Sequence, residues 1–294
     1  MKSAENIFED IKTSALYKRI LDEGNLYNAI YSLESYIFEK GLLSKEDLET
    51  YYRLGDKYEL DFIKSYIELC KEKLQDILSA PDKLFDIAVY FKIKKYDENE
   101  GIKYRPMHTA SLLDQICMVC LLMPLMYDDT SGERKLSDLA KLIPHNFFGN
   151  IPSRDVSRLF ERWQKKYKEY TDATIHKCRE YKENHKYNTE ITLDIKEFFP
   201  SVNPKFIYDF IVDKLSTSFR DEADQKCIKV IASKLLYFHI KDENIRPWER
   251  TYYGEKLNWA HEYMVKGIHH IGEFVKVRIT GSTSATLFGE EITE

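Results

Sequence analysis

The stretch Leu193–Val202, LDIKEFFPSV, decides the fold that we predict for this chain. Just before it, Glu190–Leu193 alternates polar and apolar residues as a half-buried strand does. This pattern predicts a strand that ends at Asp194, where a carboxylate meets solvent and can hold a cation. A hard Mg²⁺ ion takes carboxylate and carbonyl oxygens and keeps positions open for phosphates. We expect Asp194 and the carbonyl of Ile195 to be two of its ligands, and Phe199 to close over the sugar of a bound nucleotide.

This segment resembles motif A of reverse transcriptases, because the strand, the Asp, the pair Phe198-Phe199 and the turn Ser201-Val202 follow in the same order. In that family the Asp binds both catalytic metals, and the aromatic residue five positions later excludes the ribose 2′-hydroxyl. The resemblance assigns these roles to Asp194 and Phe199. The alternative is an ordinary strand that ends in a solvated Asp and is followed by a turn.

Composition predicts a globular α+β chain that is mostly helical. The 294 residues are 43% hydrophobic, which is ample for a core, and only 11 are Gly and 8 are Pro. The net charge of −5 excludes a uniformly basic nucleic-acid coat but leaves room for a local basic channel.

The N-terminal residues are charged throughout, and no window approaches the roughly 18 apolar residues of a membrane span. We therefore expect a cytoplasmic protein with no membrane partner. Five scattered cysteines suit a reducing compartment. Cys117 and Cys120 form a C-x-x-C inside an apolar run, with no second pair or His nearby, which favours core thiols over zinc or redox chemistry.

The chain divides into three predicted regions: a helical N-terminal region over 1–84, a fingers-like region over 85–190 and a partial palm over 191–294. In the first region, helical spacing relates Leu26, Ile30, Leu33 and Ile37, and again Leu60, Ile63, Ile67 and Leu69. Ser44 is the expected N-cap of a helix that follows it. The resemblance leaves this region without a function.

The fingers-like region begins with a predicted strand over 85–96, then Arg105-Pro106, then an apolar helix from about Leu112 that Pro124 should end or kink. Reverse transcriptases carry an Arg-Pro at the equivalent place. By this resemblance Arg105 contacts the incoming triphosphate or the template. The alternative is an Arg paired with a surface carboxylate.

A basic amphipathic helix with Trp163, Tyr167 and Tyr170 is predicted after the turn Phe148-Gly149-Asn150. This order resembles the fingers of reverse transcriptases of the abortive-infection group, which act in bacterial defence. Basic residues interleaved with aromatics bind phosphates and stack bases, and the candidates here are Arg158, Arg162, Lys165, Lys166 and Lys168. The alternative is a solvated helix face packed by its Trp.

The sequence Met126-Tyr127-Asp128-Asp129 looks like the paired-Asp motif of reverse transcriptases, but it precedes motif A. We therefore interpret it as turn and capping residues. Two metal ions need at least one further carboxylate besides Asp194, so we expect this chain to be an incomplete part of a longer protein.

Near the C-terminus a Gly turn and a run of small residues are followed by an expected helix start over 287–290. This stretch resembles motif B of the same family, in which small residues let a nucleotide or template backbone approach closely. The resemblance places template or nucleotide contacts at Gly281, Ser282, Thr283, Ser284 and Ala285. No Pro precedes the Gly here, and Ser is at 284.

Taken together, the resemblance implies a Mg²⁺-dependent reverse transcriptase, an RNA-directed DNA polymerase that consumes dNTPs in antiphage defence. Synthesis would be RNA-templated or template-independent, with an RNA or DNA strand bound and with a homo-oligomer or a further protein or RNA as possible partners. Two alternatives remain: a non-catalytic palm-and-fingers module that binds RNA or a protein, and a helical scaffold protein.

Overall fold

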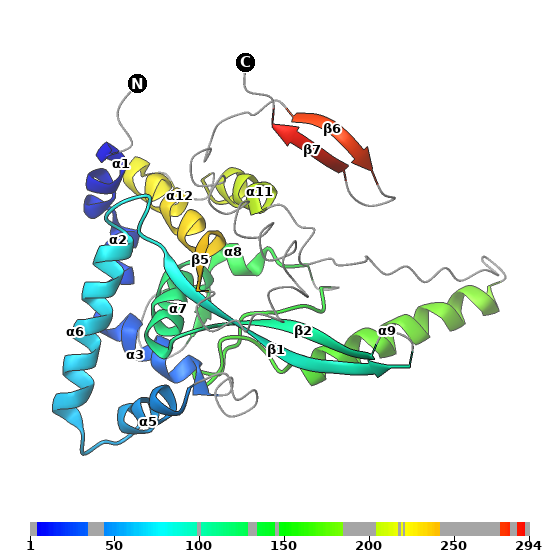
Figure 1. The fold of residues 1–294 in the computed structure, drawn as a ribbon, viewed down its shortest axis with the longest axis horizontal. Coiled ribbons are helices and arrows are strands. Elements are labelled where there is room, and N and C mark those ends of the chain that lie inside the picture. The colour runs from blue at the N-terminus through cyan, green and yellow to red at the C-terminus, as the bar shows by residue number, and fades with distance from the viewer. Residues whose placement is uncertain are drawn as a thin grey trace.

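The computed structural model describes residues 5–34, 44–98, 101–128, 134–144, 147–184, 204–216, 219, 221–241, 277–282 and 287–291. These residues are mostly helical and carry three small sheets, so the predicted α+β class is confirmed (Figure 1). The segment Leu193–Val202, with Asp194, Ile195 and Phe199, lies outside the described residues. So do Thr283, Ser284 and Ala285.

The N-terminal region is a series of helices, as predicted. Ser44 caps one of them, since its Oγ accepts a hydrogen bond from the Asp47 amide at 3.1 Å. The helical segments are α1 (Glu5–Asp10), η1 (Ile11–Thr13), α2 (Ala15–Ile20), α3 (Glu23–Ser32), α5 (Lys45–Leu54) and α6 (Leu60–Ile77).

The buried stripe of α6 differs from the predicted one. Ile63 and Ile67 are buried as expected, but Leu60 and Leu69 are 59% and 44% exposed. The stripe continues instead through Cys70, Leu74 and Ile77, because these residues keep the 3.6-residue period and Leu69 does not.

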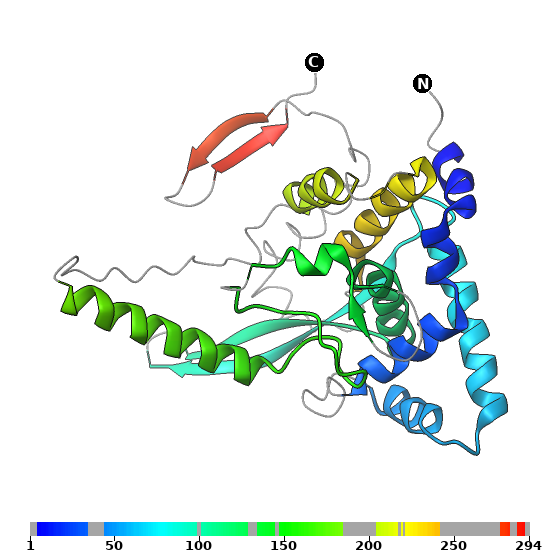
Figure 2. The same cartoon turned by 180° about the vertical axis from the view of Figure 1, so that it is seen from behind.

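The main sheet has the order β2-β1-β5. β1 (Phe85–Asp97), which the sequence predicted, pairs antiparallel with β2 (Gly101–Ala110) and parallel with β5 (Phe238–Lys241). In the first half of β1, Phe85, Ile87 and Val89 are buried, and β5 pairs only there. The other half of the β1–β2 ribbon projects beyond the helices (Figures 1 and 2).

The central helix α7 (Leu112–Met126) begins at the predicted residue, capped by Ser111, and ends two residues after Pro124. Cys117 and Cys120 lie in the core as predicted. Burial raises the pKa of the Cys120 thiol well above its ordinary value.

One hydrophobic core joins the N-terminal helices to α7 and to α12 (Glu222–Leu236). The Oδ1 of Asp224, in the first turn of α12, accepts hydrogen bonds from the Ser14 hydroxyl at 2.6 Å and from the Leu16 amide at 3.0 Å. Residues far apart in the sequence therefore share one interior. α11 (Pro204–Ser216) packs on α12, which ends at Leu236, ahead of β5.

Two predictions about short segments are wrong. Tyr127–Asp128 is not a turn: it forms β3, which pairs with β4 (Lys135–Leu136) ahead of α8 (Asp138–Lys141). Leu287–Glu291 does not start a helix: it forms β7, antiparallel to β6 (Val277–Ser282). In both cases pairing with a second strand satisfies the backbone hydrogen bonds, and the pattern of a single segment does not show its partner strand.

Within the described ranges, no helix combines the length and the apolar character that a membrane crossing requires.

Candidate nucleic-acid interface

Two arms project from the same side of the helical core. One is the outer half of the β1–β2 ribbon, and the other is α9 (Trp163–Glu183), a helix of 21 residues (Figures 1 and 2). Each arm carries basic and aromatic side chains. Because these arms expose such residues away from the core, they form the candidate site in the part of the chain that the structure describes.

The ribbon arm is exposed on both faces. Ile93 and Tyr96 are 63% and 72% exposed, and Lys92, Lys94 and Lys95 are exposed beside them. Lys92 lies opposite Arg105 in the strand register, which places the predicted Arg105 on this arm. Basic side chains on a projecting ribbon suit contact with a phosphate backbone.

None of the residues of α9 is buried. Trp163, Tyr167 and Tyr170 are each at least half exposed. The alternative of a solvated helix face packed by its Trp therefore holds for the solvated face but not for Trp163. The ring centroids of Tyr167 and Tyr170 are 6.4 Å apart, and Phe148 meets Tyr170 edge to face at 5.9 Å. The helix thus presents a row of aromatic rings to solvent.

Carboxylates pair with two lysines of the predicted site, Lys165 and Lys166. Lys166 Nζ lies 3.1 Å from Glu161 Oε2 and 3.0 Å from Glu169 Oε2. Lys165 is more loosely placed, at 3.8 Å and 3.9 Å from the same two carboxyl groups, and 64% of its side chain is exposed. Hydrogen bonding to Glu169 raises the pKa of Lys166. The first turns of α9 therefore carry a balanced ion cluster and not a bare basic patch.

The two arginines of the predicted site differ in exposure. Arg162 is exposed at the N-cap position of α9. Only 17% of the Arg158 side chain is exposed, and its Nε lies 3.7 Å from Asp155 Oδ2. Arg162 and Lys165 are therefore exposed, whereas Arg158 and Lys166 are largely covered and contact carboxylates.

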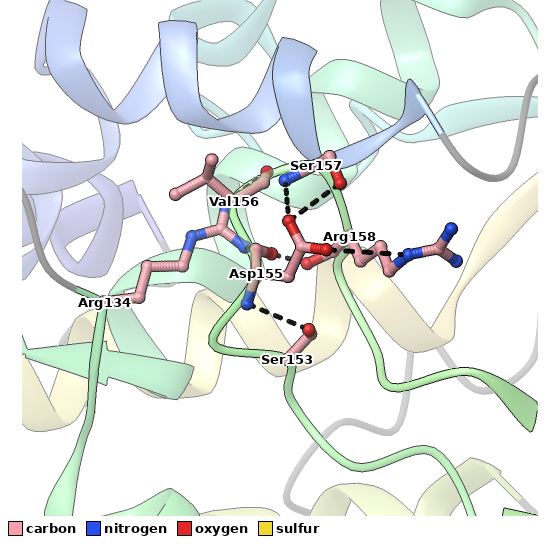
Figure 3. A network of polar contacts seen from close by, with 6 residues as sticks. All are labelled: Arg134, Ser153, Asp155, Val156, Ser157 and Arg158. Atoms are coloured by element: carbon pink, nitrogen blue, oxygen red, sulfur yellow. Dashed lines mark hydrogen bonds and ion pairs between the residues drawn. The ribbon is translucent and has the colours of Figure 1, made fainter. Parts of the chain in front are cut away.

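The segment leading into α9 is held by Arg134, which sequence reasoning missed (Figure 3). Its guanidinium donates hydrogen bonds to the carbonyls of Asp155, Val156 and Arg158, at 3.0, 3.1 and 2.8 Å. It also donates to the Ser32 hydroxyl on α3. Burial lowers the pKa of Arg134 from its ordinary value, but a guanidinium stays charged at neutral pH. Arg134 therefore ties the base of α9 to the N-terminal helices.

Tyr127 completes this anchor, which we call the Arg134 clasp: Arg134, Tyr127 and the carbonyls of residues 153–159 that they bind. The Tyr127 hydroxyl donates toward the carbonyls of Ser153, at 2.7 Å, and Leu159, at 3.2 Å. Arg134 Cζ lies 4.9 Å from the centre of its ring. Hydrogen bonds from Ser157 hold the pKa of the Asp155 carboxyl below its ordinary value.

Of the other predicted residues, the structure describes Gly281 and Ser282. Gly281 and Ser282 lie on β6, within the hairpin with β7. Asp194, Ile195 and Phe199 belong to the part of the chain that the structure does not describe. Among the described residues, no group of three or more His, Cys, Asp or Glu side chains is arranged to hold a metal ion.

Sequence and fold comparisons give no relative from which a role can be transferred. No family model, no curated protein and no solved structure matches this chain.

Proposed function

We propose that this chain is the nucleic-acid-binding part of a reverse-transcriptase-type nucleotidyltransferase, which uses Mg²⁺ and dNTPs to make DNA in antiphage defence. The observation that carries the proposal is the segment Leu193–Val202, in which Asp194 ends a strand pattern and Phe199 follows at the spacing of a sugar-contacting aromatic. In this proposal Asp194 and the Ile195 carbonyl hold Mg²⁺, and Phe199 excludes the ribose 2′-hydroxyl.

The two exposed arms support the nucleic-acid-binding half of the proposal. A polymerase must hold a template or primer strand outside its core, and exposed lysines with aromatic rings provide phosphate contacts and stacking surfaces. The ribbon and α9 supply both kinds of side chain. Arg105, on the ribbon, and Gly281 and Ser282, on β6, keep their proposed contacts with template or nucleotide.

The test is incorporation of each labelled dNTP by the full-length gene product with Mg²⁺, with and without added RNA. We expect Asp194→Asn to abolish incorporation, because the amide cannot balance the charge of the metal ions. We expect Phe199→Ala to admit ribonucleotides. Matched controls are Asp213→Asn and Phe206→Ala, which change exposed residues of α11 and should leave incorporation unchanged. Incorporation that survives Asp194→Asn contradicts the proposal.

A second candidate is a non-catalytic module that binds nucleic acid through the same arms. The specific observation in its favour is that both arms carry exposed basic and aromatic side chains, which can contact a strand without any catalytic group. Under this reading the wild type incorporates no dNTP under any condition, but binds RNA or DNA with an affinity that Asp194→Asn leaves unchanged.

A further inference from the structure

We infer that one face of α9 binds single-stranded nucleic acid by stacking bases on its aromatic rings. This inference rests on the proposed function and narrows it, since it names the class of strand and the residues that hold it. The face, which we call the stacking face, consists of Trp163, Tyr167, Tyr170 and Tyr181 with the threonines and lysines between them.

The spacing of these rings places them on one side of the helix. Relative to Trp163, the tyrosines follow at four, seven and eighteen residues, and eighteen residues make five complete turns. The face is exposed: Trp163, Tyr167 and Tyr170 are 56%, 62% and 50% accessible. These rings are therefore available to a ligand and are not part of the hydrophobic core.

The carboxylates of α9 lie away from the stacking face, on a side of the helix that they share with Lys165, Lys168 and Arg179. At 100° per residue, the helix places all of its carboxylates on the half opposite the stacking face: Glu169, Asp172, Glu180 and Glu183. Lys166 and Lys177 lie at one edge of the face, and Lys182 lies at the other. Lys177 Nζ is 5.6 Å from the centre of the Tyr181 ring. A strand lying on the rings thus meets no carboxylate on the face itself. Lys182 is exposed at one edge, and at the other edge Lys166 and Lys177 are each paired with carboxylates, Lys177 with Glu180 at 2.8 Å.

The side chains favour a nucleic acid over a second helix. A helix pair would be expected to bury Leu or Ile along such a stripe, but between the rings this face has Thr171, Thr174 and Lys177. Ile175 lies off the stripe. Aromatic rings alternating with hydroxyls and lysines suit bases and phosphates better than an apolar partner.

The geometry favours a single strand over a duplex. A ring stacks on the face of a base, and in a duplex those faces are covered by neighbouring base pairs. Trp163 to Tyr181 spans about 27 Å, which matches roughly eight nucleotides at stacked spacing. The Arg134 clasp holds the base of the helix, so the rings are presented from a fixed support.

The test is binding of fluorescently labelled 12-nucleotide oligo-dT and oligo-U, and of a 12-base-pair duplex, measured by fluorescence anisotropy with the full chain. We expect the single strands to bind at least about tenfold more tightly than the duplex. Tyr167→Ala and Tyr170→Ala should each weaken single-strand binding about fivefold or more, because each removes a stacking surface. Comparison of the dT and U probes shows whether the strand is DNA or RNA.

Two controls change similar residues outside the stacking face. Tyr58→Ala removes a tyrosine that is 84% exposed on another part of the surface, and Ile175→Ala removes an apolar side chain from α9 away from the rings. Both should bind as the wild type does. Circular dichroism establishes that the helix content of each variant is unchanged.

Tryptophan fluorescence gives a second, direct readout of stacking. Oligo-dT should quench the fluorescence of the wild type, and Trp163→Phe should lose that quenching while keeping most of the affinity, since Phe still stacks. Equal affinity for duplex and single strand, absence of binding by the wild type, or affinity that the tyrosine variants leave unchanged would overturn the inference. Failure of the proposed polymerase is a separate result, because it is measured by dNTP incorporation in Asp194→Asn.

Discussion

Lys234 is a buried cation held by backbone carbonyls. Its Nζ donates to the carbonyls of Ala80, at 2.6 Å, and Lys83, at 2.7 Å, with Pro81 at 3.2 Å, and the residue is 1% exposed. These carbonyls belong to the turn that leads into β1. Lys234, on α12, therefore anchors the turn that precedes β1. Arg134 anchors the segment that precedes α9 in the same way.

Replacing Lys234 should destabilise the whole protein. Lys234→Met keeps the length of the side chain but leaves the carbonyls without their donor, which costs about 2–4 kcal/mol of unfolding free energy. Urea denaturation followed by circular dichroism measures this loss. Lys229→Met, which changes an exposed lysine of the same helix, is the control and should change stability by less than about 0.5 kcal/mol. Equal stabilities of the two variants would contradict the prediction.

The same lysine makes stability depend on pH. Burial lowers the pKa of Lys234 to about 8, against an ordinary value of 10.5. Between these values the unfolded chain holds a proton that the folded chain has released, so raising the pH favours folding. The unfolding free energy of the wild type minus that of Lys234→Met should therefore rise from about pH 8 to pH 10.5 and stay level below pH 8. A difference that stays level through this window would contradict the prediction, because the folded chain would then keep its ammonium charged up to the pH at which the unfolded chain releases its proton.

We expect even the conservative replacement of Arg134 by Lys to destabilise the protein. Arg134→Lys keeps the charge, but one ammonium cannot reach the carbonyls of residues 155–158 and the Ser32 hydroxyl together. We expect a loss of about 2–3 kcal/mol in urea denaturation and faster amide hydrogen exchange over residues 153–158. Arg154→Lys, at an exposed neighbouring position, should leave both unchanged.

At the scale of elements, the two halves of the β1–β2 ribbon have different roles: the inner half contributes to stability, and binding is proposed for the outer half. Its inner half buries Phe85, Ile87 and Val89, and its outer half is exposed, as at Ile93 and Tyr96. Only the inner half contributes to the core, so the length of the outer half must have another use. Contact with a partner strand is the use that its lysines favour.

Shortening the ribbon should weaken nucleic-acid binding and leave the free energy of unfolding nearly unchanged. Phe91 and Pro106 face each other in register, so residues 92–105 can be replaced by an Asn-Gly turn. We expect the unfolding free energy to change by less than about 1 kcal/mol, because little apolar surface is lost from the core. Affinity for oligo-dT should fall, with a weaker dependence on salt. Lys92→Gln/Lys94→Gln/Lys95→Gln, which keeps the ribbon, should reproduce the change in salt dependence; a large loss of stability on shortening would contradict the assignment.

At the scale of the whole molecule, one core unites the N-terminal helices with α12, about 210 positions later in the sequence. Ile11, Leu16 and Ile20 are almost completely buried in the same cluster as Ile228 and Ile231 of α12. The N-terminal helices are therefore part of the interior and not an appendage. Their removal would expose the apolar side of α12.

This arrangement predicts a single unfolding transition. Ile20→Ala should lower the unfolding free energy by about 2–5 kcal/mol, because it leaves a cavity in the shared core. Hydrogen exchange in α12 should accelerate together with that in α2. Lys18→Ala, on the exposed side of the same helix, is the control. Faster exchange confined to α2 would show that the N-terminal helices fold independently.

Local patterns in the sequence determined the α+β class, the N-terminal helices, the strand at residues 85–97 and the helix at Leu112. These predictions succeeded because periodicity and capping act over a few residues, as at Ser44 and Ser111. The basic residues of α9 were also visible in the sequence. Their pairing was not visible there: Glu161 and Glu169 both contact Lys166.

Only the tertiary structure decided which polar groups are buried and which segments pair. Lys234 reaches carbonyls about 150 positions earlier, and Arg134 reaches a hydroxyl about 100 positions earlier, so neither shows a local signal. The strand at Leu287–Glu291 depends on its partner at Val277–Ser282 in the same way. The physical reason is that a buried cation or a strand is stabilised by groups that folding brings together. The residues next to it in the sequence do not indicate which groups these are.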